Sequence, residues 1–274
     1  METKIKSSII NQTIVMKLKL IICTILVSAL FITCKKDSPG INKAVVECYL
    51  IPGKPVSVKI TKEISYGIDT VFQTIQNLNV TITNNSNSYT LTNSGNGIYT
   101  NSTIPVLTGE IYQLFFNYNN ETVSAKTKIP SKPVNFKESD SVFRFPVFGP
   151  GGPPPSFPDP IKLNWDNSDN SYYLVVVTNN ESNPVLIFND TTGRKRPVFR
   201  TQPSQSNTTD LTFFQGSYFG MHSVVLCKIW PEYAALYEKN STNSNNLSEP
   251  PTNIKNGRGI FTGVNTDTLY IRVY

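Results

Sequence analysis

The chain has 274 residues, only one of them His and four of them Cys, and its formal net charge at pH 7 is +6. The first 33 residues carry four Lys and one Glu, so the 241 residues from Cys34 onward have a net charge of only +3, dispersed along the chain. A chain without a basic stripe lacks the electrostatic footprint of a nucleic-acid-binding protein, so we exclude nucleic acid as a partner. A chain of this length forms one large or two ordinary domains with adequate cores.

The first predicted element is a secretory signal at residues 16–33. Lys17 and Lys19 form a basic start, and residues 20–32 form an apolar run. A charged start followed by about 7–15 apolar residues is typical of a signal peptide, whereas a membrane-spanning helix needs about 20. Residues 1–15 fit neither part of a signal. We interpret them as an N-terminal extension, and either Met1 or Met16 as the true start.

The end of the apolar run, LFITCKKD at residues 30–37, resembles a lipobox, the site at which a bacterial lipoprotein is diacylated on cysteine and cut just before it. We predict that Cys34 is the lipidated first residue of the mature protein and that residues 34–42 are a tether. Thr33 departs from the pattern, because Gly, Ala or Ser is usual there. Each buried acyl CH₂ contributes about 0.8 kcal/mol, so the lipid would hold the protein on a membrane. The alternative makes Cys34 an ordinary cysteine of a soluble protein.

Residues 43–130 are predicted to form an N-terminal β-sandwich of immunoglobulin-like or transthyretin-like type. Apolar and polar residues alternate at 56–60 (VSVKI) and at 80–83 (VTIT), with turn residues in between, and this pattern indicates a sandwich. Residues 93–97 (NSGNG) are interpreted as a hairpin turn, because Gly and Asn tolerate positive φ. The predicted strands are 43–50, 55–62, 78–84, 88–93, 97–102, 110–118 and 122–130.

Residues 131–274 are predicted to form a second β-rich, sandwich-like domain with one short helix. The boundary is placed at 130–133 (PSKP), and Trp165 and Tyr173 are expected in the core. The predicted strands are 134–145, two within 161–179, 183–190, 211–219, 223–230 and 268–274.

The short helix is predicted at residues 231–239. Pro231 suits the first turn of a helix, and Tyr233, Leu236 and Tyr237 share one face at i, i+3 and i+4 spacing. We expect this stripe to pack in the core.

Residues 145–160 hold seven Pro and three Gly and are predicted to be an exposed loop, because such a segment cannot join a sheet ladder. Phe145, Phe148 and Phe157 lie in this loop. One interpretation is that they pin the loop to its domain. The other, our candidate site, is a contact surface for another protein.

The sequence favours a protein that is not an enzyme. His222 is the one histidine, and no metal-binding, calcium-loop or nucleophile-elbow motif is present, so we predict no catalytic residue, metal site or cofactor. Cys48 and Cys227 lie in strand-like runs. They are either buried small apolar residues or, in an oxidising envelope, a disulfide.

Several passages resemble a Bacteroidota lipoprotein family known as a domain of unknown function (four-two-four-nine). The resemblance spans about 35–270, and its most distinctive passage is 253–261 (NIKNGRGIF). From the residues alone, we interpret this passage as a turn into the last strands, in which Gly257 and Gly259 supply unusual φ values and Phe261 fills the core. The other passages are VVECYLIPGKPVSVKIT, NVTIT, YTL, GIYT, GEIYQLFF, SAKTKIPSKP and DNSDNSYYLVVV.

The resemblance implies an outer-membrane lipoprotein, of a kind often encoded beside TonB-dependent receptors, and carries no catalytic residue with it. We therefore expect a non-catalytic binding or accessory subunit that acts beside such a receptor in nutrient uptake. The alternative is a cell-surface adhesin or glycan-binding lipoprotein, with a small-molecule or glycan ligand that the sequence does not name. Lys35-Lys36-Asp37 loosely resembles a surface-export tag, which favours the cell surface over the periplasmic face.

Overall fold

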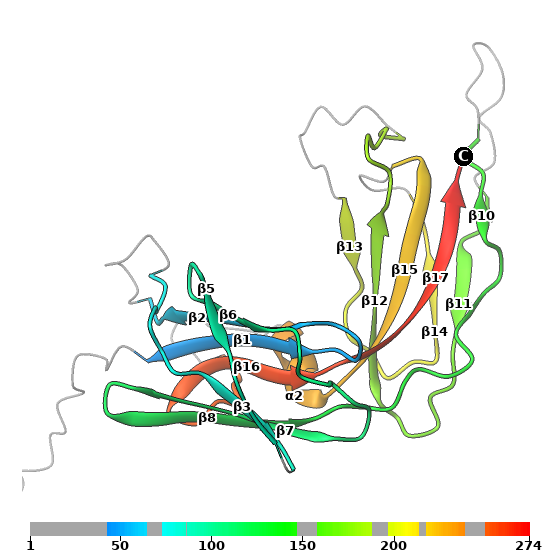
Figure 1. The fold of residues 1–274 in the computed structure, drawn as a ribbon. Helices are drawn as coiled ribbons and strands as arrows, with labels where there is room; N and C mark the ends of the chain where they lie inside the picture. The colour runs from blue at the N-terminus through cyan, green and yellow to red at the C-terminus, as the bar shows by residue number, and fades with distance from the viewer. Residues whose placement is uncertain are drawn as a thin grey trace, which may run out of the picture. The chain divides into compact units, whose positions relative to one another are not determined.

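The computed structural model of the chain describes residues 43–64, 73–85, 87–146, 158–187, 197–213, 218–238 and 250–274. The chain divides into two compact units, 1–41 and 42–274, and all of the described residues belong to the second. Strands dominate these residues (Figure 1), and their helical structure is limited to α2 (Pro231–Ala234) and the 3-10 helix η2 (Ala235–Tyr237). The predicted all-β class with one short helix is confirmed. No helix in the described ranges is long and apolar enough to cross a membrane.

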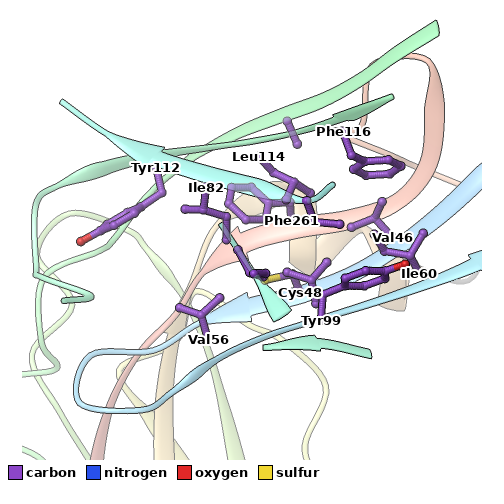
Figure 2. Close-up of a cluster of buried hydrophobic side chains, with 14 of the residues drawn as sticks. Val46, Cys48, Val56, Ile60, Ile82, Tyr99, Tyr112, Leu114, Phe116 and Phe261 are labelled. Carbon is purple, nitrogen blue, oxygen red and sulfur yellow. The ribbon is translucent and has the colours of Figure 1, made fainter. Parts of the chain in front are cut away.

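Two sheets form the first sandwich, one with the strand order β16-β1-β2-β6-β5 and the other β4-β3-β7-β8. Apolar side chains from both sheets fill a single core between them, as Figure 2 shows. The strands are β1 (Ala44–Leu50), β2 (Val56–Lys62), β3 (Thr81–Asn84), β4 (Asn87–Thr90), β5 (Thr92–Gly95), β6 (Ile98–Asn101), β7 (Ile111–Tyr118), β8 (Glu121–Lys128) and β16 (Gly257–Gly263).

The alternation read from the sequence sets the inner face of this sandwich. In β2, Val56, Val58 and Ile60 are buried, whereas Ser57 and Lys59 between them are exposed. Strand β7 likewise turns every second residue into the core (Figure 2). Fully burying one such side chain contributes about 1.5–3 kcal/mol, so these rows hold the two sheets together.

The first sandwich is completed by a strand from the far end of the chain. Strand β16 pairs in parallel with β1, from Ala44 opposite Gly257 to Leu50 opposite Gly263, whereas β1 and β2 are antiparallel. Phe261 of β16 is fully buried in the same core. The expected boundary at residue 130 assigned β16 to the second domain, but its pairing makes it part of the first sheet. Local patterns carry no information about a partner so distant along the chain.

Two glycines let β16 approach β1 closely. Gly259 has a φ of +94°, as expected, and a Cβ there would collide with the Val46 carbonyl oxygen. The expectation of an unusual φ is wrong for Gly257, which lies outside the positive-φ region. A Cβ on Gly257 would lie 2.8 Å from Ile254 Cγ2 and 3.0 Å from the Ala44 oxygen, so close packing is the reason for this glycine.

The residues just before β16 attach to the opposite sheet. Lys255 and Ser124 of β8 exchange two backbone hydrogen bonds, of 2.8 and 3.2 Å. Asn256 Nδ2 donates to the Thr122 oxygen of β8 at 3.0 Å. We call residues 250–263 the C-terminal segment. It contacts both sheets of the first sandwich and thereby closes one side of it.

The second sandwich has its own core, between the sheets β10-β17-β15-β12-β13 and β14-β11-β9. Trp165 and Tyr173 are buried there with ring centroids 5.6 Å apart, as predicted. The strands are β9 (Lys137–Glu138), β10 (Val142–Phe143), β11 (Ile161–Asn164), β12 (Tyr172–Asn179), β13 (Val198–Arg200), β14 (Thr208–Leu211), β15 (Gly220–Ile229) and β17 (Asn265–Val273).

Four predictions in this region need correction. The strand predicted at 134–145 is two short strands of different sheets, β9 and β10, and the strand predicted at 211–219 keeps, over its described residues, only the last residue of β14 and a bridge at Tyr218. Of the predicted helical stripe, Tyr233 and Tyr237 pack against a small apolar cluster, but Leu236 is exposed, because the helix tightens to a 3-10 turn that shifts its face. The strand predicted at 183–190 is reduced, over its described residues, to a bridge between Leu186 and Tyr218.

Asparagine, beside glycine, supplies left-handed backbone conformations in the turns of the fold. All non-glycine residues with positive φ among the described residues are asparagines. One of them, Asn96, lies in the hairpin between β5 and β6, where the sequence predicts a turn. Asn tolerates the left-handed conformation better than other residues with a Cβ. The full set is Asn77, Asn96, Asn119, Asn120, Asn135, Asn170 and Asn256.

Candidate functional site

The two described cysteines are buried and free. Cys48 lies in the core of the first sandwich, and Cys227 lies in a separate cluster beside α2, so the structure contains the thiols rather than the disulfide. Burial raises the pKa of Cys227 to about 12 and that of Cys48 above the normal range. Both thiols are therefore neutral near pH 7, and neither is suited to act as a nucleophile or metal ligand.

His222 is a structural residue of β15. It is buried, with its ring 5.1 Å from that of Phe213. Burial lowers its pKa, which favours the neutral ring. In the tautomer that fits both neighbours, Nδ1–H donates to the Gly220 oxygen at 3.1 Å and Nε2 accepts from Asn179 Nδ2 at 3.2 Å. Both ring nitrogens are then occupied, which leaves neither for acid–base chemistry.

Lys228 is a buried cation that the sequence reasoning missed. Its Nζ lies 2.7 Å from Asp169 Oδ2 and 3.0 Å from Ser131 Oγ, and 5.7 Å from the centroid of the Tyr173 ring. Burial lowers the pKa of Lys228, but the hydrogen bond and charge of Asp169 outweigh this and leave it above its usual value. The hydrogen bond from Lys228 lowers the pKa of Asp169. In the sequence, the signal for this buried cation is a single Lys within the apolar run SVVLCKIW.

These groups do not assemble into a reactive centre. Among the described residues, no three His, Cys, Asp or Glu side chains lie close enough together to hold a metal ion. The Lys228–Asp169 pair joins β15 to the turn before β12, so its role is structural.

Only one of the four candidate site residues lies in the described part. Phe145 is half-buried against the core of the second sandwich, and its N–H donates to the Tyr274 oxygen at 2.8 Å. This placement fits a residue that pins the start of the loop. Cys34, Phe148 and Phe157 lie outside the described residues.

The outer face of sheet β4-β3-β7-β8 is polar and hollowed; we call it the polar face. One hollow, of about 440 Å³, is lined by residues that include Thr83, Asn84, Gln113 and Lys126. A second, of about 270 Å³, is lined by residues that include Thr81, Phe115, Asn117 and Thr122. Sequence reasoning used these strands only for the core and did not consider what their outward residues would bind.

The outer face of sheet β10-β17-β15-β12-β13 is more apolar. Val176 and Val225 face each other across β12 and β15 and are half-buried, while Val198 and Tyr270 on neighbouring strands are 43% and 59% exposed. We call these four residues the apolar face. At one end of the same sheet face, α2 packs onto Leu174 and Cys227.

Comparisons with known proteins identify a family and little more. A search of curated proteins found no match. Among solved structures, domains A168–A170 of titin are similar, with 11% identity over 85% of this chain and 67% of that one, but the TM-score is only 0.21 and the likeness has no bearing on function. The family model described as "Domain of unknown function (DUF4249)" matches residues 36–269. The chain therefore belongs to the DUF4249 family.

Proposed function

We propose that this protein is an outer-membrane lipoprotein, anchored through Cys34, that acts as a non-catalytic binding subunit beside a TonB-dependent receptor in nutrient uptake. The observation that carries the proposal is the contrast between its interior and its surface. The buried titratable groups described above are neutral or paired internally, whereas two sheet faces present half-buried side chains to the outside.

The anchor and the partner are supported by the sequence. A signal at residues 16–33 leads to a lipobox-like site at Cys34, and eight residues separate this cysteine from Lys43, where the described part begins. The resemblance to outer-membrane lipoproteins encoded beside TonB-dependent receptors supports the partner. We place the protein on the cell surface, with the periplasmic face as the alternative.

The apolar face supports a protein partner, and we propose that it contacts the receptor. Exposed apolar patches with polar borders mark protein contacts, and the exposed Arg200 and Arg272 border this one. The same sheet face already binds α2 at one end, so the open part continues a surface that packs against protein.

The test is purification of the tagged full-length protein from outer membrane in mild detergent, at native expression, with Cys34→Ala as the matched variant. We expect a TonB-dependent barrel to co-elute in stoichiometric amount with the wild type, and the variant to leave the membrane fraction. A lipoprotein that elutes alone would contradict the proposed partner. A Cys34→Ala variant that stays in the outer membrane would contradict the anchor.

The second candidate, a surface adhesin or glycan-binding lipoprotein, is favoured by one specific observation, the polar face. Binding at this face would not require a receptor.

A further inference from the structure

The polar face has a regular arrangement of outward side chains on three neighbouring strands. Gln113 of β7 lies between Thr83 of β3 and Lys126 of β8. Two residues further along β7, Phe115 lies between Thr81 and Ser124. The next outward position pairs Asn117 with Thr122 of β8. Successive side chains of a strand point to opposite faces, so all of these lie on the side away from the core.

Phe115 is not explained by packing of the core. Leu114 and Phe116, on either side of it, belong to the core of the first sandwich, but Phe115 does not. It is half-buried, and both of its cross-strand neighbours, Thr81 and Ser124, are small. A ring between small neighbours keeps a face open to a ligand, and an aromatic face is a good surface for the C–H groups of a sugar ring.

Unused hydrogen-bonding groups surround this ring. Within the described residues, the side chains of Thr81, Thr83 and Gln113 make no hydrogen bond, although all three are only half-exposed. Amides and hydroxyls both donate and accept, which matches the hydroxyl groups of a carbohydrate.

The spacing of the hollows indicates an elongated ligand. The larger hollow, of about 440 Å³, falls within the usual range of ligand clefts, about 300–1,000 Å³. Gln113 lines one hollow and Asn117 the other. Four residues along a strand correspond to about 14 Å at 3.4 Å per residue. A ligand that reaches both hollows is therefore a chain of several sugar units rather than one.

The charge of the face indicates a neutral ligand. Among the described residues that line the two hollows, Lys126 is the one cation, and Glu110 at the border already accepts a hydrogen bond from Asn85 at 2.6 Å. An anionic polymer would require several cations, and a protein partner would favour a more apolar centre.

We propose that the polar face binds a neutral, linear oligosaccharide, with Phe115 against a sugar ring and Gln113, Thr81 and Thr83 hydrogen-bonded to its hydroxyls. This site goes beyond the proposed accessory role and is independent of it, because it requires no receptor.

The probes are neutral six-unit oligosaccharides of glucose, mannose, xylose and galactose, titrated calorimetrically into the full-length lipoprotein in detergent. We expect at least one to bind at millimolar concentration or below. Phe115→Ala should weaken that binding at least tenfold, Phe115→Trp should retain it because the ring is kept, and Gln113→Ala should weaken it several-fold. Tyr274→Ala, which removes an exposed ring elsewhere, should have no effect.

Three results would overturn the proposal. They are no binding of any probe at millimolar concentration, equal binding by wild type and a folded Phe115→Ala variant, and binding that salt or Lys126→Ala abolishes while Phe115→Ala does not. Thermal unfolding of each variant shows whether it is folded. If Phe115→Ala does not fold, the binding of the oligosaccharide by Gln113→Ala and Phe115→Trp tests the proposal instead. A negative result in the oligosaccharide titrations would not contradict co-purification with a receptor, and a negative co-purification would not contradict oligosaccharide binding.

Discussion

The two sandwiches have similar apolar cores but different outer faces. In the first, the outward residues of β3 and β7 are mostly amides and hydroxyls around Phe115. In the second, the outward residues of β12 and β15 include the paired Val176 and Val225. Strand alternation constrains only the inner face, because the core requires it. The outer face is free to match what it binds, and the difference supports the two binding roles that we propose, a hydroxyl-rich ligand on one sandwich and a protein on the other.

The sandwiches also differ in how they are completed. The first depends on the C-terminal segment, which brings β16 beside β1 and Lys255 beside Ser124. Residues of the second sandwich follow one another between 134 and 229, with β17 added at the end. The stability of the first sandwich is therefore sensitive to substitutions near the C-terminus, far along the chain from most of its strands.

Among the variants that test this difference between the sandwiches, Phe261→Ala should have the largest effect on the free energy of unfolding. Phe261 is fully buried in the first core, so its removal should lower the free energy of unfolding by about 3–5 kcal/mol. Urea unfolding measures this, with Leu236→Ala, an exposed position, as the control expected to stay within about 0.5 kcal/mol of wild type. If Phe261→Ala lowers the free energy of unfolding by less than about 1 kcal/mol, the core of the first sandwich does not depend on β16.

A pair of glycine variants sharpens the same point. Gly259 and Gly53 both have positive φ, of +94° and +74°, but only Gly259 has a backbone oxygen in the way of a Cβ. Gly53→Ala should lower the free energy of unfolding by about 1 kcal/mol, from backbone strain alone. Gly259→Ala should lower it by clearly more, or prevent folding. Equal losses in the two variants would argue against close contact between β16 and β1.

Lys228→Met tests the ion pair of the second sandwich. We expect a loss of about 1 kcal/mol at pH 7, because the Asp169 side chain is 57% exposed and the pair is partly screened. The lowered pKa of Asp169 means that its contribution is present above its unfolded value of about 3.9 and is lost as pH falls through the still lower folded value. The raised pKa of Lys228 confines the alkaline loss to pH above about 10.4.

The measurement is the difference in free energy of unfolding between wild type and Lys228→Met as a function of pH. It should be constant near neutrality and shrink below about pH 4. Lys162→Met, at an exposed lysine of β11, should show no such pattern. A difference that grows as the pH falls would contradict the assigned pair.

The smallest expected effect concerns the number of cysteine thiols that react with a reagent. In the folded protein, Cys48 and Cys227 should resist a thiol reagent at pH 8, because burial keeps both protonated. After unfolding, two thiols should react if Cys34 carries the lipid and Cys23 is removed with the signal, as we propose. A third reactive thiol would show that Cys34 is not lipidated.

The sequence was a good guide to local structure and a poor one to distant pairing. Alternation located β1, β2, β3, β6, β7 and β8, since the residues of each strand show which of its faces is buried. Residues 88–93, predicted as one strand, are divided between β4 and β5, which belong to different sheets. The sequence indicates a turn at residues 253–261, but residues 257–261 form part of β16, whose glycines have a clear role only beside Val46 of β1. The polar face was also missed, because Gln113 and Phe115 look like ordinary outward positions until β3 and β8 lie beside them.

The central claim is that the two outer faces have separate roles, and the most direct test is native co-purification of two variants from the outer membrane. Tyr270→Asp changes an exposed residue of the apolar face, and Phe115→Ala changes the polar face. We expect the TonB-dependent barrel to be lost with Tyr270→Asp and retained with Phe115→Ala. Retention of the barrel by both folded variants, or its loss from both, would contradict the claim.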